Sequence, residues 1–356
     1  MTRPAEEDAV DDRPAVGTST PPYAGPRVAS TLDFTTHEGF RKRGDRLRPS
    51  GEPATTRNQL RLLRKVLVAA RQGRPLILFS SRGKLKPDLL ACVVLGFWRC
   101  RPPVVLVGEM WQPGAGPRAV LERLVVRLAD RAVDRYLVLS QAEAEQLPRV
   151  WPVTPDKMRV RSFYFEPTEH GMSDEDPLPV RERCVVAGGD SFRDYGPLLE
   201  AARQMPDVPF LLVTRTLDGV DLPPNVEVRS VPYAEYFRLL SRAGVVAVPV
   251  QTGLRRSAGL LIALMAMWLG RPTVATTALA MDEYVEDGVT GVLVDGSVAA
   301  WREALSRLLD DTDEADRLAA AARRTTRERY TFDAYVRGIL AELDEAARER
   351  IVRRRH

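Results

Sequence analysis

The sequence predicts an α/β protein built from two Rossmann-like domains whose parallel sheets face one cleft. Two stretches of the chain alternate short apolar segments with amphipathic segments, and a polar segment lies between them. The short segments are apolar at successive positions, which is typical of parallel strands covered on both faces. Ligands bind such sheets at the carboxyl ends of the strands, so we expect the site to lie between the two domains.

The length of 356 residues, 44% of them hydrophobic, suits about two globular domains. The first 26 residues are rich in proline, acidic residues, threonine and serine, which predicts a disordered leader. The last helix of the chain could pack back on the first domain. The predicted units are a leader at 1–26, an N-terminal domain at 27–165, a linker at 166–182, a C-terminal domain at 183–330 and a helix at 331–356.

The first stretch begins at residue 27. Its apolar segments predict strands at 27–34, 75–79, 103–107 and 136–139. Apolar residues at helical spacing predict helices at 57–72, 84–98 and 117–133. Residues 35–55 are polar and are predicted to form a loop. Ser140 followed by Glu143 forms a capping box that starts a further short helix.

The second stretch repeats the same alternation after the polar segment. Its predicted strands lie at 184–188, 209–213, 245–250, 272–276 and 290–294. Its predicted helices lie at 195–204, 233–242 and 257–269, and the rest of the chain is predicted to be helical to about residue 350. Neither stretch carries a glycine-rich dinucleotide or triphosphate loop, so phosphate would have to meet other groups, such as helix amino ends.

Composition excludes several classes of protein. The three cysteines form no CxxC pair, which argues against a disulfide scaffold and fits a reducing cytoplasm. The three histidines are scattered, which argues against a histidine metal cluster. The acidic start of the chain resembles no signal peptide, and no apolar stretch reaches the length that spans a bilayer. We therefore expect a cytoplasmic protein without a transmembrane segment.

The charge of the chain does not indicate a nucleic-acid partner. Of 52 basic residues only five are lysine and 47 are arginine, and they are mixed with 48 acidic residues, giving a net charge of +4. The one basic run, 350–355, is interpreted as a solvated helix end. Peripheral membrane contact stays open for residues 89–98, although a buried core helix is the alternative there. The oligomeric state is not predicted.

Residues 270–294 read GRPTVATTALAMDEYVEDGVTGVLV. This stretch resembles the donor-site signature of retaining glycosyltransferases of family 4, the glycosyl transferases group 1. The similarity extends over about residues 58–345. The resemblance implies the GT-B fold, with an acceptor-binding N-terminal domain and a nucleotide-sugar-binding C-terminal domain. It implies a nucleoside-diphosphate sugar as co-substrate and no other cofactor.

The chain departs from that family at the two glutamates of an E-x7-E motif, which fall on Ser257 and Met265. In the family the first glutamate contacts the transferred sugar and the second usually holds the ribose. Ser257 can still form a hydrogen bond, whereas Met265 is expected to pack in the core. A histidine of the family's acceptor domain falls on Glu109, which we expect to act as an acceptor base or orienting group.

The predicted donor-binding residues follow strands of the C-terminal domain. Arg193, which the resemblance places at a basic phosphate ligand, is expected to stabilise the leaving diphosphate and is therefore also a catalytic candidate. Glycines would allow close approach of the backbone, and Glu283 would bind ribose or sugar, with helix capping as the alternative. For each arginine the alternative is an ordinary surface residue. The full donor set is Gly188, Gly189, Arg193, Arg255, Arg256, Ser257, Ala258, Gly259 and Glu283.

The predicted acceptor residues lie in loops of the N-terminal domain. Trp111 could stack on an acceptor ring or cover the edge of the core. His37 could be an acceptor-side base or an exposed loop residue. Ser81 and Arg82 precede a helix and could touch either substrate. No metal ligands are predicted, because the Asp-x-Asp triplets at 174–176 and 311–313 fall in the linker and at a helix start.

The sequence therefore predicts a metal-independent retaining glycosyltransferase with a small-molecule acceptor. UDP is a possible nucleotide, and the arginines beside Ser257 would suit a uronic acid as the sugar. An arginine- and alanine-rich composition suits bacterial natural-product biosynthesis, such as that of an antibiotic or nucleoside. The alternatives are a catalytically silent sugar-nucleotide-binding or partner subunit, a cell-envelope transferase acting on a lipid-linked acceptor, and a nucleotide-sugar epimerase.

Overall fold

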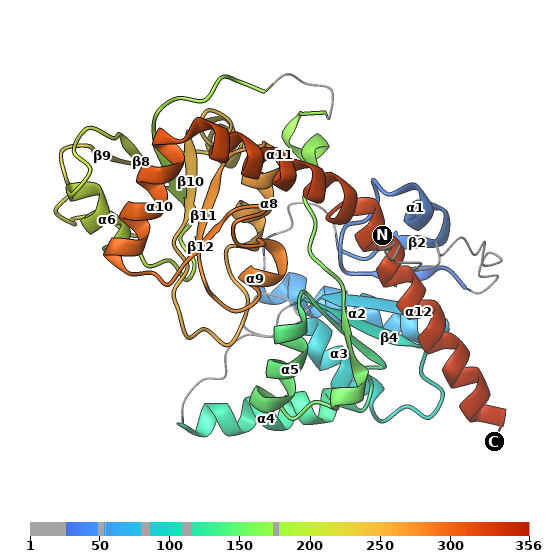
Figure 1. Cartoon of the computed structure of the whole chain (residues 1–356). Helices are drawn as coiled ribbons and strands as arrows, with labels where there is room; N and C mark the ends of the chain where they lie inside the picture. Colours follow the sequence, from blue (N-terminus) through green and yellow to red (C-terminus); the bar gives the residue numbers. More distant parts are fainter. Residues whose placement is uncertain are drawn as a thin grey trace, which may run out of the picture.

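The computed structural model describes residues 26–48, 53, 55–79, 86–108, 116–173 and 178–355. These residues form two α/β halves, each built on a six-stranded parallel sheet (Figure 1). The predicted leader lies outside the described residues apart from residue 26. The predicted α/β class with two parallel sheets is confirmed.

The sheet of the N-terminal half has the order β2-β1-β3-β4-β5-β6. Its strands are β1 (Val28–Ser30), β2 (Gly44–Arg46), β3 (Leu76–Phe79), β4 (Val104–Val107), β5 (Arg135–Val138) and β6 (Met158–Val160). Its helices are α1 (Glu38–Arg43), α2 (Thr56–Arg71), α3 (Pro87–Leu95), α4 (Gly116–Asp130) and α5 (Gln141–Val150). The strands are short, and the central ones are buried along their whole length, because helices cover both faces.

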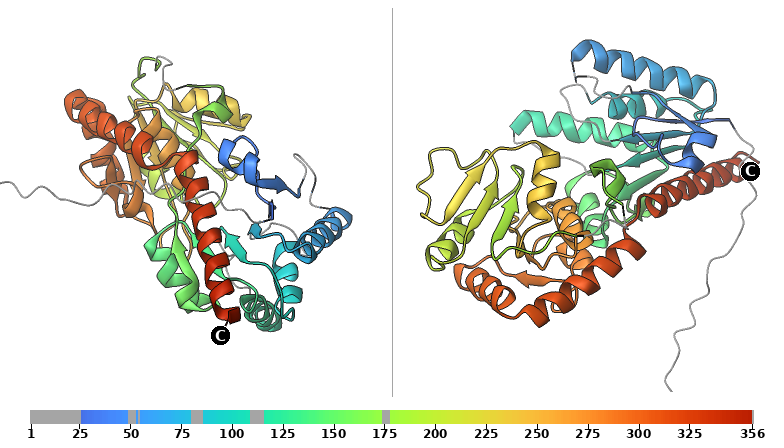
Figure 2. Two further views of the ribbon diagram at one scale, coloured as in Figure 1. Left: turned by 90° about the vertical axis from the view of Figure 1, so that its right-hand side faces the viewer. Right: turned by 90° about the horizontal axis from the view of Figure 1, so that it is seen from above.

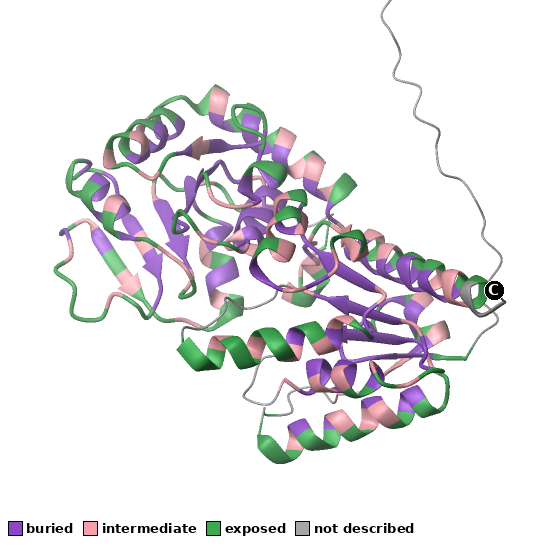
Figure 3. Cartoon of the chain, turned by 90° about the horizontal axis from the view of Figure 1, so that it is seen from below, coloured by how far each residue is buried: buried purple, intermediate pink, exposed green. Residues whose placement is uncertain are grey.

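Alternate residues of β3 show how the two faces of this sheet are covered. Leu76 and Leu78 pack with α2, α3 and α4, whereas Ile77 points into a core that includes the last helix of the chain. Figure 2 shows α2 and that last helix on opposite sides of the sheet. The burial colouring of Figure 3 shows the strands buried and the outer faces of the helices exposed.

The sheet of the C-terminal half has the order β12-β11-β10-β7-β8-β9. Its strands are β7 (Val185–Gly188), β8 (Phe210–Val213), β9 (Val226–Arg229), β10 (Val245–Val248), β11 (Thr273–Thr276) and β12 (Val292–Val294). Its helices are α6 (Gly196–Arg203), α7 (Tyr233–Leu240), α8 (Leu260–Trp268), α9 (Met281–Tyr284), α10 (Val298–Asp310) and α11 (Thr312–Arg329). β7 lies between β10 and β8, so the strand order reverses beside it, which is where ligands of such sheets bind.

The last helix, α12 (Phe332–Arg355), leaves the C-terminal half and packs on the N-terminal sheet (Figure 2). Glu342 on α12 pairs with Arg135, Arg159 and Arg161 of β5, β6 and the residue after it. Asp344, two residues further along, pairs with Arg43 of α1. These buried and partly buried ion pairs join the end of the chain to its first half.

The prediction of a loop over 35–55 is wrong for 38–46, which form α1 and β2. His37 caps α1 through its ring, and Phe40 is buried with its ring centroid 5.5 Å from that of Phe34. Gly44–Arg46 pairs with β1 as the edge strand of the sheet. A helix of six residues with one buried side chain has no visible apolar period, so the polar composition of the segment concealed it.

Candidate functional site

Arg193 lies beyond the carboxyl end of β7, in the loop that leads to α6. Its Nε donates to the carbonyl of Gly188 at 3.1 Å and its Nη1 donates to the carbonyl of Ser191 at 2.8 Å. Asp190, in the same loop, pairs with Arg215 instead, so no carboxylate of the described residues forms an ion pair with Arg193. Burial lowers the pKa of Arg193. A partly buried guanidinium held only by carbonyls is a suitable site for an anion.

Two glycines shape the backbone beside Arg193. Gly189 has φ of +112°, and a Cβ there would lie 2.8 Å from Arg193 Nη2. Its carbonyl accepts a hydrogen bond from Tyr195 Oη at 2.8 Å. A Cβ at Gly188 would lie 2.5 Å from Tyr236 Oη. Both positions therefore exclude larger residues, and the predicted pair Gly188–Gly189 forms the inner wall around the guanidinium.

Tyr236 of α7 is a site candidate that the sequence did not single out. Its side chain is 5% exposed, and its hydroxyl has no hydrogen-bond partner among the described residues. Burial raises its pKa, so the hydroxyl is neutral and available as a donor. An unpaired buried hydroxyl beside Gly188 and near Arg193 is suited to a ligand oxygen. The sequence signal was only a tyrosine on the inner side of a predicted helix.

The loop before α8 brings the second group of predicted donor residues to the same edge of the sheet. Arg255 is exposed, whereas Arg256 lies over the ring of Phe192, 5.0 Å from its centroid. The Arg193 loop and the loop before α8 therefore meet at this stack, and Phe192 has a φ of +57°. Gly259 has φ of +79°, and a Cβ there would lie 2.6 Å from Val250.

Ser257 does not face an open cleft, because it is bound by the other half of the chain. Its side chain is buried, and both its Oγ and its backbone N donate to Glu143 Oε1, at 2.6 Å and 2.9 Å. The other carboxylate oxygen of Glu143 accepts from the backbone N of Leu139 at 2.9 Å. The predicted capping box is half formed, because Ser140 accepts from the N of Glu143 but the Glu143 carboxylate binds Leu139 and Ser257 instead.

Glu283 of α9 also joins the two halves, but here the carboxylate belongs to the C-terminal half and the donors belong to the N-terminal half. Its two carboxylate oxygens accept from the backbone N of Gln141 at 2.7 Å and of Ala142 at 2.8 Å, at the amino end of α5. Glu283 therefore caps a helix, as the alternative prediction stated, and the capped helix is α5 of the other half. We call Glu143, Ser257, Glu283 and the amino end of α5 the clasp. The donor roles of Ser257 and Glu283 stay predictions.

His37 is buried, so the alternative of an exposed loop histidine is wrong. Its Nδ1 accepts from the backbone N of Phe40 at 3.1 Å, and its Nε2 lies 3.0 Å from Asp333 Oδ1 on α12. Both ring nitrogens are therefore engaged: one caps α1 and the other contacts Asp333 of α12. Its role as an acceptor-side base is untested.

Four predicted acceptor residues, Glu109, Trp111, Ser81 and Arg82, lie outside the described residues. Ala258 lies in the loop before α8, between Ser257 and Gly259, and is partly buried. The structure therefore brings together the donor candidates Gly188, Gly189, Arg193, Arg255, Arg256, Ala258 and Gly259, and it does not test the acceptor site.

Among the described residues, no group of three acidic, histidine or cysteine side chains is arranged to hold a metal ion. Asp311 of the second Asp-x-Asp triplet caps α11 by accepting from the N of Glu314 at 2.9 Å. The first triplet lies outside the described residues. The same part of the chain contains no helix that is both long enough and apolar enough to cross a bilayer.

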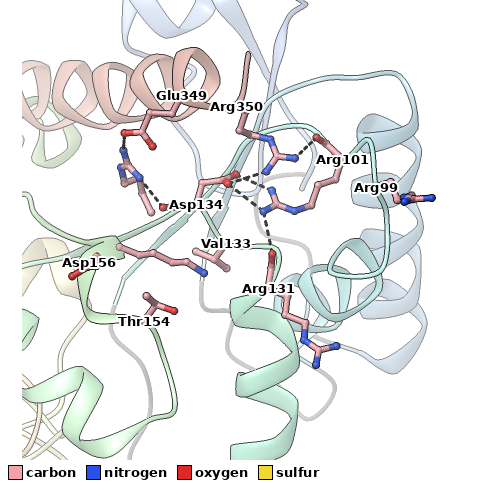
Figure 4. A pocket seen from close by; sticks show the side chains of 11 residues that line it. Arg99, Arg101, Arg131, Val133, Asp134, Thr154, Asp156, Glu349 and Arg350 are labelled. Carbon is pink, nitrogen blue, oxygen red and sulfur yellow. Dashed lines mark hydrogen bonds and ion pairs between the residues drawn. The ribbon is translucent and has the colours of Figure 1, made fainter. Parts of the chain in front are cut away.

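A cavity of about 430 Å³ lies at the opposite, amino-terminal edge of the first sheet (Figure 4). Five of its charged side chains are engaged with one another. Asp134 accepts from both Arg101 and Arg350, and Arg135 pairs with Glu349 of α12. This cavity is therefore the junction of α12 with the sheet and contains none of the predicted site residues.

Residues 192–311 match the family model described as glycosyl transferases group 1. The match begins in the loop that holds Arg193 and runs through the loop before α8 to the end of α10. It covers about a third of the chain, all of it in the C-terminal half.

Two of the most similar curated relatives are both named D-inositol 3-phosphate glycosyltransferase. The relative from Salinispora tropica is 38% identical over 238 residues, which are 67% of this chain and 44% of the relative. The relative from Xylanimonas cellulosilytica is 36% identical over 177 residues, which are 49% of this chain and 38% of the relative. The chain thus spans less than half the length of these relatives.

Solved structures with the same fold are more distant in sequence. Sucrose-phosphate synthase from Thermosynechococcus elongatus has a TM-score of 0.63 at 18% identity, covering 82% of this chain and 79% of its own. The Anabaena protein HepE, solved in complex with UDP, has a TM-score of 0.60 at 19% identity, covering 80% and 82%. The chain therefore has the GT-B fold, as the sequence predicted.

Proposed function

We propose that this chain is a glycosyltransferase that moves a sugar from a nucleoside diphosphate to an acceptor hydroxyl. The proposal is supported by the family match over 192–311 and by the names of the curated relatives. The donor would bind at the carboxyl ends of β7 and β10, and the acceptor would bind against the N-terminal half.

The single observation that carries the proposal is the position of Arg193. Its guanidinium is partly buried, is held by two carbonyls and has no ion-pair partner among the described residues. It lies in the segment that matches the family model, beside a glycine with positive φ. Such a cation stabilises the negative charge that builds on a leaving diphosphate, which is where most of the catalytic effect of such a site arises.

In the proposed reaction the bond between the anomeric carbon and the diphosphate oxygen breaks, and a bond from the acceptor oxygen to that carbon forms. The diphosphate oxygen leaves with the electron pair of the broken bond, and the proton of the acceptor hydroxyl passes to that leaving oxygen. Arg193 would hold that diphosphate, and Tyr236 would donate to one of its oxygens or to the sugar. Retention of anomeric configuration and independence of a metal ion are parts of the proposal.

UDP is the proposed nucleotide, because solved neighbours contain UDP or UDP-glucose. A phosphorylated polyol is the first acceptor to test, because the curated relatives are named for inositol 3-phosphate. A uronic acid as the transferred sugar stays a finer proposal. It would depend on Arg255, whose side chain is exposed, because Arg256 is already stacked on Phe192.

A ligand screen followed by a transfer assay tests the proposal. The thermal midpoint is measured with UDP, GDP, dTDP and ADP, each alone and as a sugar conjugate. A ligand at a hundred times its dissociation constant stabilises the fold by about 2.7 kcal/mol. The donor that binds is then incubated with inositol phosphates, with and without EDTA, and the anomeric configuration of the product is read by NMR.

The outcomes separate the alternatives. A midpoint shift and product formation support the transferase. A midpoint shift with no product from any acceptor supports a silent sugar-nucleotide-binding subunit. No shift with any nucleotide would contradict donor binding by this chain.

A further inference from the structure

A further cavity, of about 600 Å³, lies beside helix α11, which packs on α8 (Figure 1). It is lined by Leu178, by Gly270 and by one stripe of α11 that runs from Asp316 to Glu328. Leu178 precedes β7 and Gly270 precedes β11, so the cavity lies at the amino-terminal edge of the second sheet. The donor candidates lie beyond the carboxyl ends of β7 and β10, so this cavity is separate from them.

Arg271, the residue after Gly270, is a buried cation beside this cavity and is only 3% exposed. Its Nη2 donates to the carbonyl of Pro179 at 2.9 Å, and its Nε has no hydrogen-bond partner. No carboxylate of the described residues forms an ion pair with it. Burial, together with the nearby guanidinium groups of Arg181 and Arg323, lowers the pKa of Arg271 to about 10. The group is still charged at neutral pH, and a buried charge is normally paired.

Positive charge exceeds negative charge around this cavity. Three arginines of α11 line it, and Arg181 and Arg271 lie close to it, which makes five. The described residues of its wall contribute two carboxylates, Asp316, which pairs with Arg181, and the exposed Glu328. The surplus is therefore three positive charges. The carbonyl end of α8 offers only about half a negative charge, so it does not neutralise this surplus. The three arginines of α11 are Arg323, Arg324 and Arg327.

We propose that this cavity binds a small anion with two phosphate groups, at a site separate from the donor site. A guanidinium group offers paired N–H donors that match the oxygens of a phosphate. A compact ligand with two phosphates carries about three negative charges at neutral pH, which is the size of the surplus. Ala319 and Ala320 are short side chains between the arginines of α11 and leave room for such a ligand. The volume lies in the ordinary range of small-molecule sites.

The test uses inorganic diphosphate as the probe, with EDTA and without magnesium. The proposed donor site also holds a diphosphate, so the probe is titrated by calorimetry into Arg193→Ala as well as into the wild-type chain. We expect Arg193→Ala to retain one site for diphosphate, with an affinity that falls as salt is raised. Orthophosphate should bind there about tenfold more weakly, because it leaves some of the arginines without a partner. Citrate that binds more tightly than diphosphate would overturn the choice of phosphate.

Single substitutions in the Arg193→Ala chain locate the site. Arg324→Gln removes an exposed cation that lines the cavity and should weaken diphosphate binding about tenfold. Arg271→Met removes the buried cation and should weaken the binding by a similar factor. Arg302→Gln is the matched control, because Arg302 is an exposed arginine of α10 outside the cavity, and it should leave the affinity unchanged.

Thermal midpoints show that each variant is folded, and Arg324→Gln keeps the test decisive if Arg271→Met does not fold. The absence of a diphosphate site in Arg193→Ala would overturn the proposal, as would equal diphosphate affinity in Arg324→Gln and Arg302→Gln. The proposed function fails in a different way, because UDP would then bind Arg193→Ala as tightly as it binds the wild-type chain.

Discussion

Ser257 Oγ donates a hydrogen bond of 2.6 Å to Glu143 Oε1, across the boundary between the two halves of the chain. Ser257 lies near the end of the loop before α8, and Glu143 lies in the first turn of α5. A second contact joins the halves, because the Glu283 carboxylate of the C-terminal half accepts from two amides at the amino end of α5. The clasp therefore fixes the loop with the predicted donor residues relative to the N-terminal half.

Replacing Glu143 tests the clasp. Glu143→Ala leaves the donors on Ser257 and Leu139 without their acceptor in a buried place, so we expect it to lower the free energy of unfolding by about 2–3 kcal/mol. Hydrogen exchange should show faster exchange of the Ser257 and Leu139 amides, which lose their acceptor. Glu145→Ala, at an exposed position of the same helix, is the control and should change neither quantity. Unchanged stability and unchanged exchange of these two amides in Glu143→Ala would contradict the clasp.

Glu283 can be tested as a helix cap against its predicted donor role. Glu283→Ala removes the acceptor for two amides of α5 and should cost about 1 kcal/mol of stability. Calorimetry with UDP and with the UDP-sugar separates the roles. A cap alone predicts that both affinities change by the same factor, whereas a sugar ligand predicts a greater loss for the UDP-sugar.

Gly189 should affect both the stability of the fold, through its backbone angle, and the binding of UDP, through its contact with Arg193. Gly189→Ala places a methyl group against Arg193 at a φ of +112°, so we expect a loss of about 1 kcal/mol in stability and displacement of the guanidinium. Gly219→Ala is the matched control, because Gly219 also has a positive φ but no atom near its missing side chain. Both variants should be less stable, and only Gly189→Ala should bind UDP more weakly.

Lys86 should titrate in an unusual range. Burial lowers its pKa from 10.5 to about 8. Between these two values the unfolded chain holds the proton and the folded chain does not, so Lys86 makes the free energy of unfolding rise with pH across that window. The chain has only five lysines, so reductive methylation with carbon-13 and NMR can follow each one. A resonance that titrates near pH 8 and vanishes in Lys86→Met is expected. A Lys86 resonance that titrates near 10.5 would contradict the prediction.

The strand–helix alternation was readable because buried parallel strands are apolar at every position, as in β4 and β10. β2 could not be predicted in this way, because its three residues lie at the edge of the sheet, are only partly covered and are not apolar. β9 alternates between buried and exposed positions for the same reason. Edge strands and one-turn helices carry too few apolar residues to show a period.

The candidate site was predictable where a local pattern sets it and not where two distant segments meet. The glycine pair and Arg193 follow one strand, so their proximity could be inferred. The partners of Ser257 and Glu283 could not be, because Glu143 and the amino end of α5 lie more than a hundred residues away in the chain. Tyr236 contacts the position of Gly188 from helix α7, and no spacing in the sequence predicts that contact.

The most direct test of the proposed function is calorimetric titration of UDP into the wild-type chain, Arg193→Ala and Arg302→Ala. Arg302 is an exposed residue of α10 and serves as the control for loss of a positive charge. Hydrogen bonds to a charged group are worth about 1.5–3 kcal/mol, so Arg193→Ala should bind UDP at least about tenfold more weakly, with Arg302→Ala unchanged. Equal affinity in Arg193→Ala and wild type, or no binding of UDP or any other nucleoside diphosphate by the wild type, would contradict the assignment of a nucleotide-sugar site to this loop.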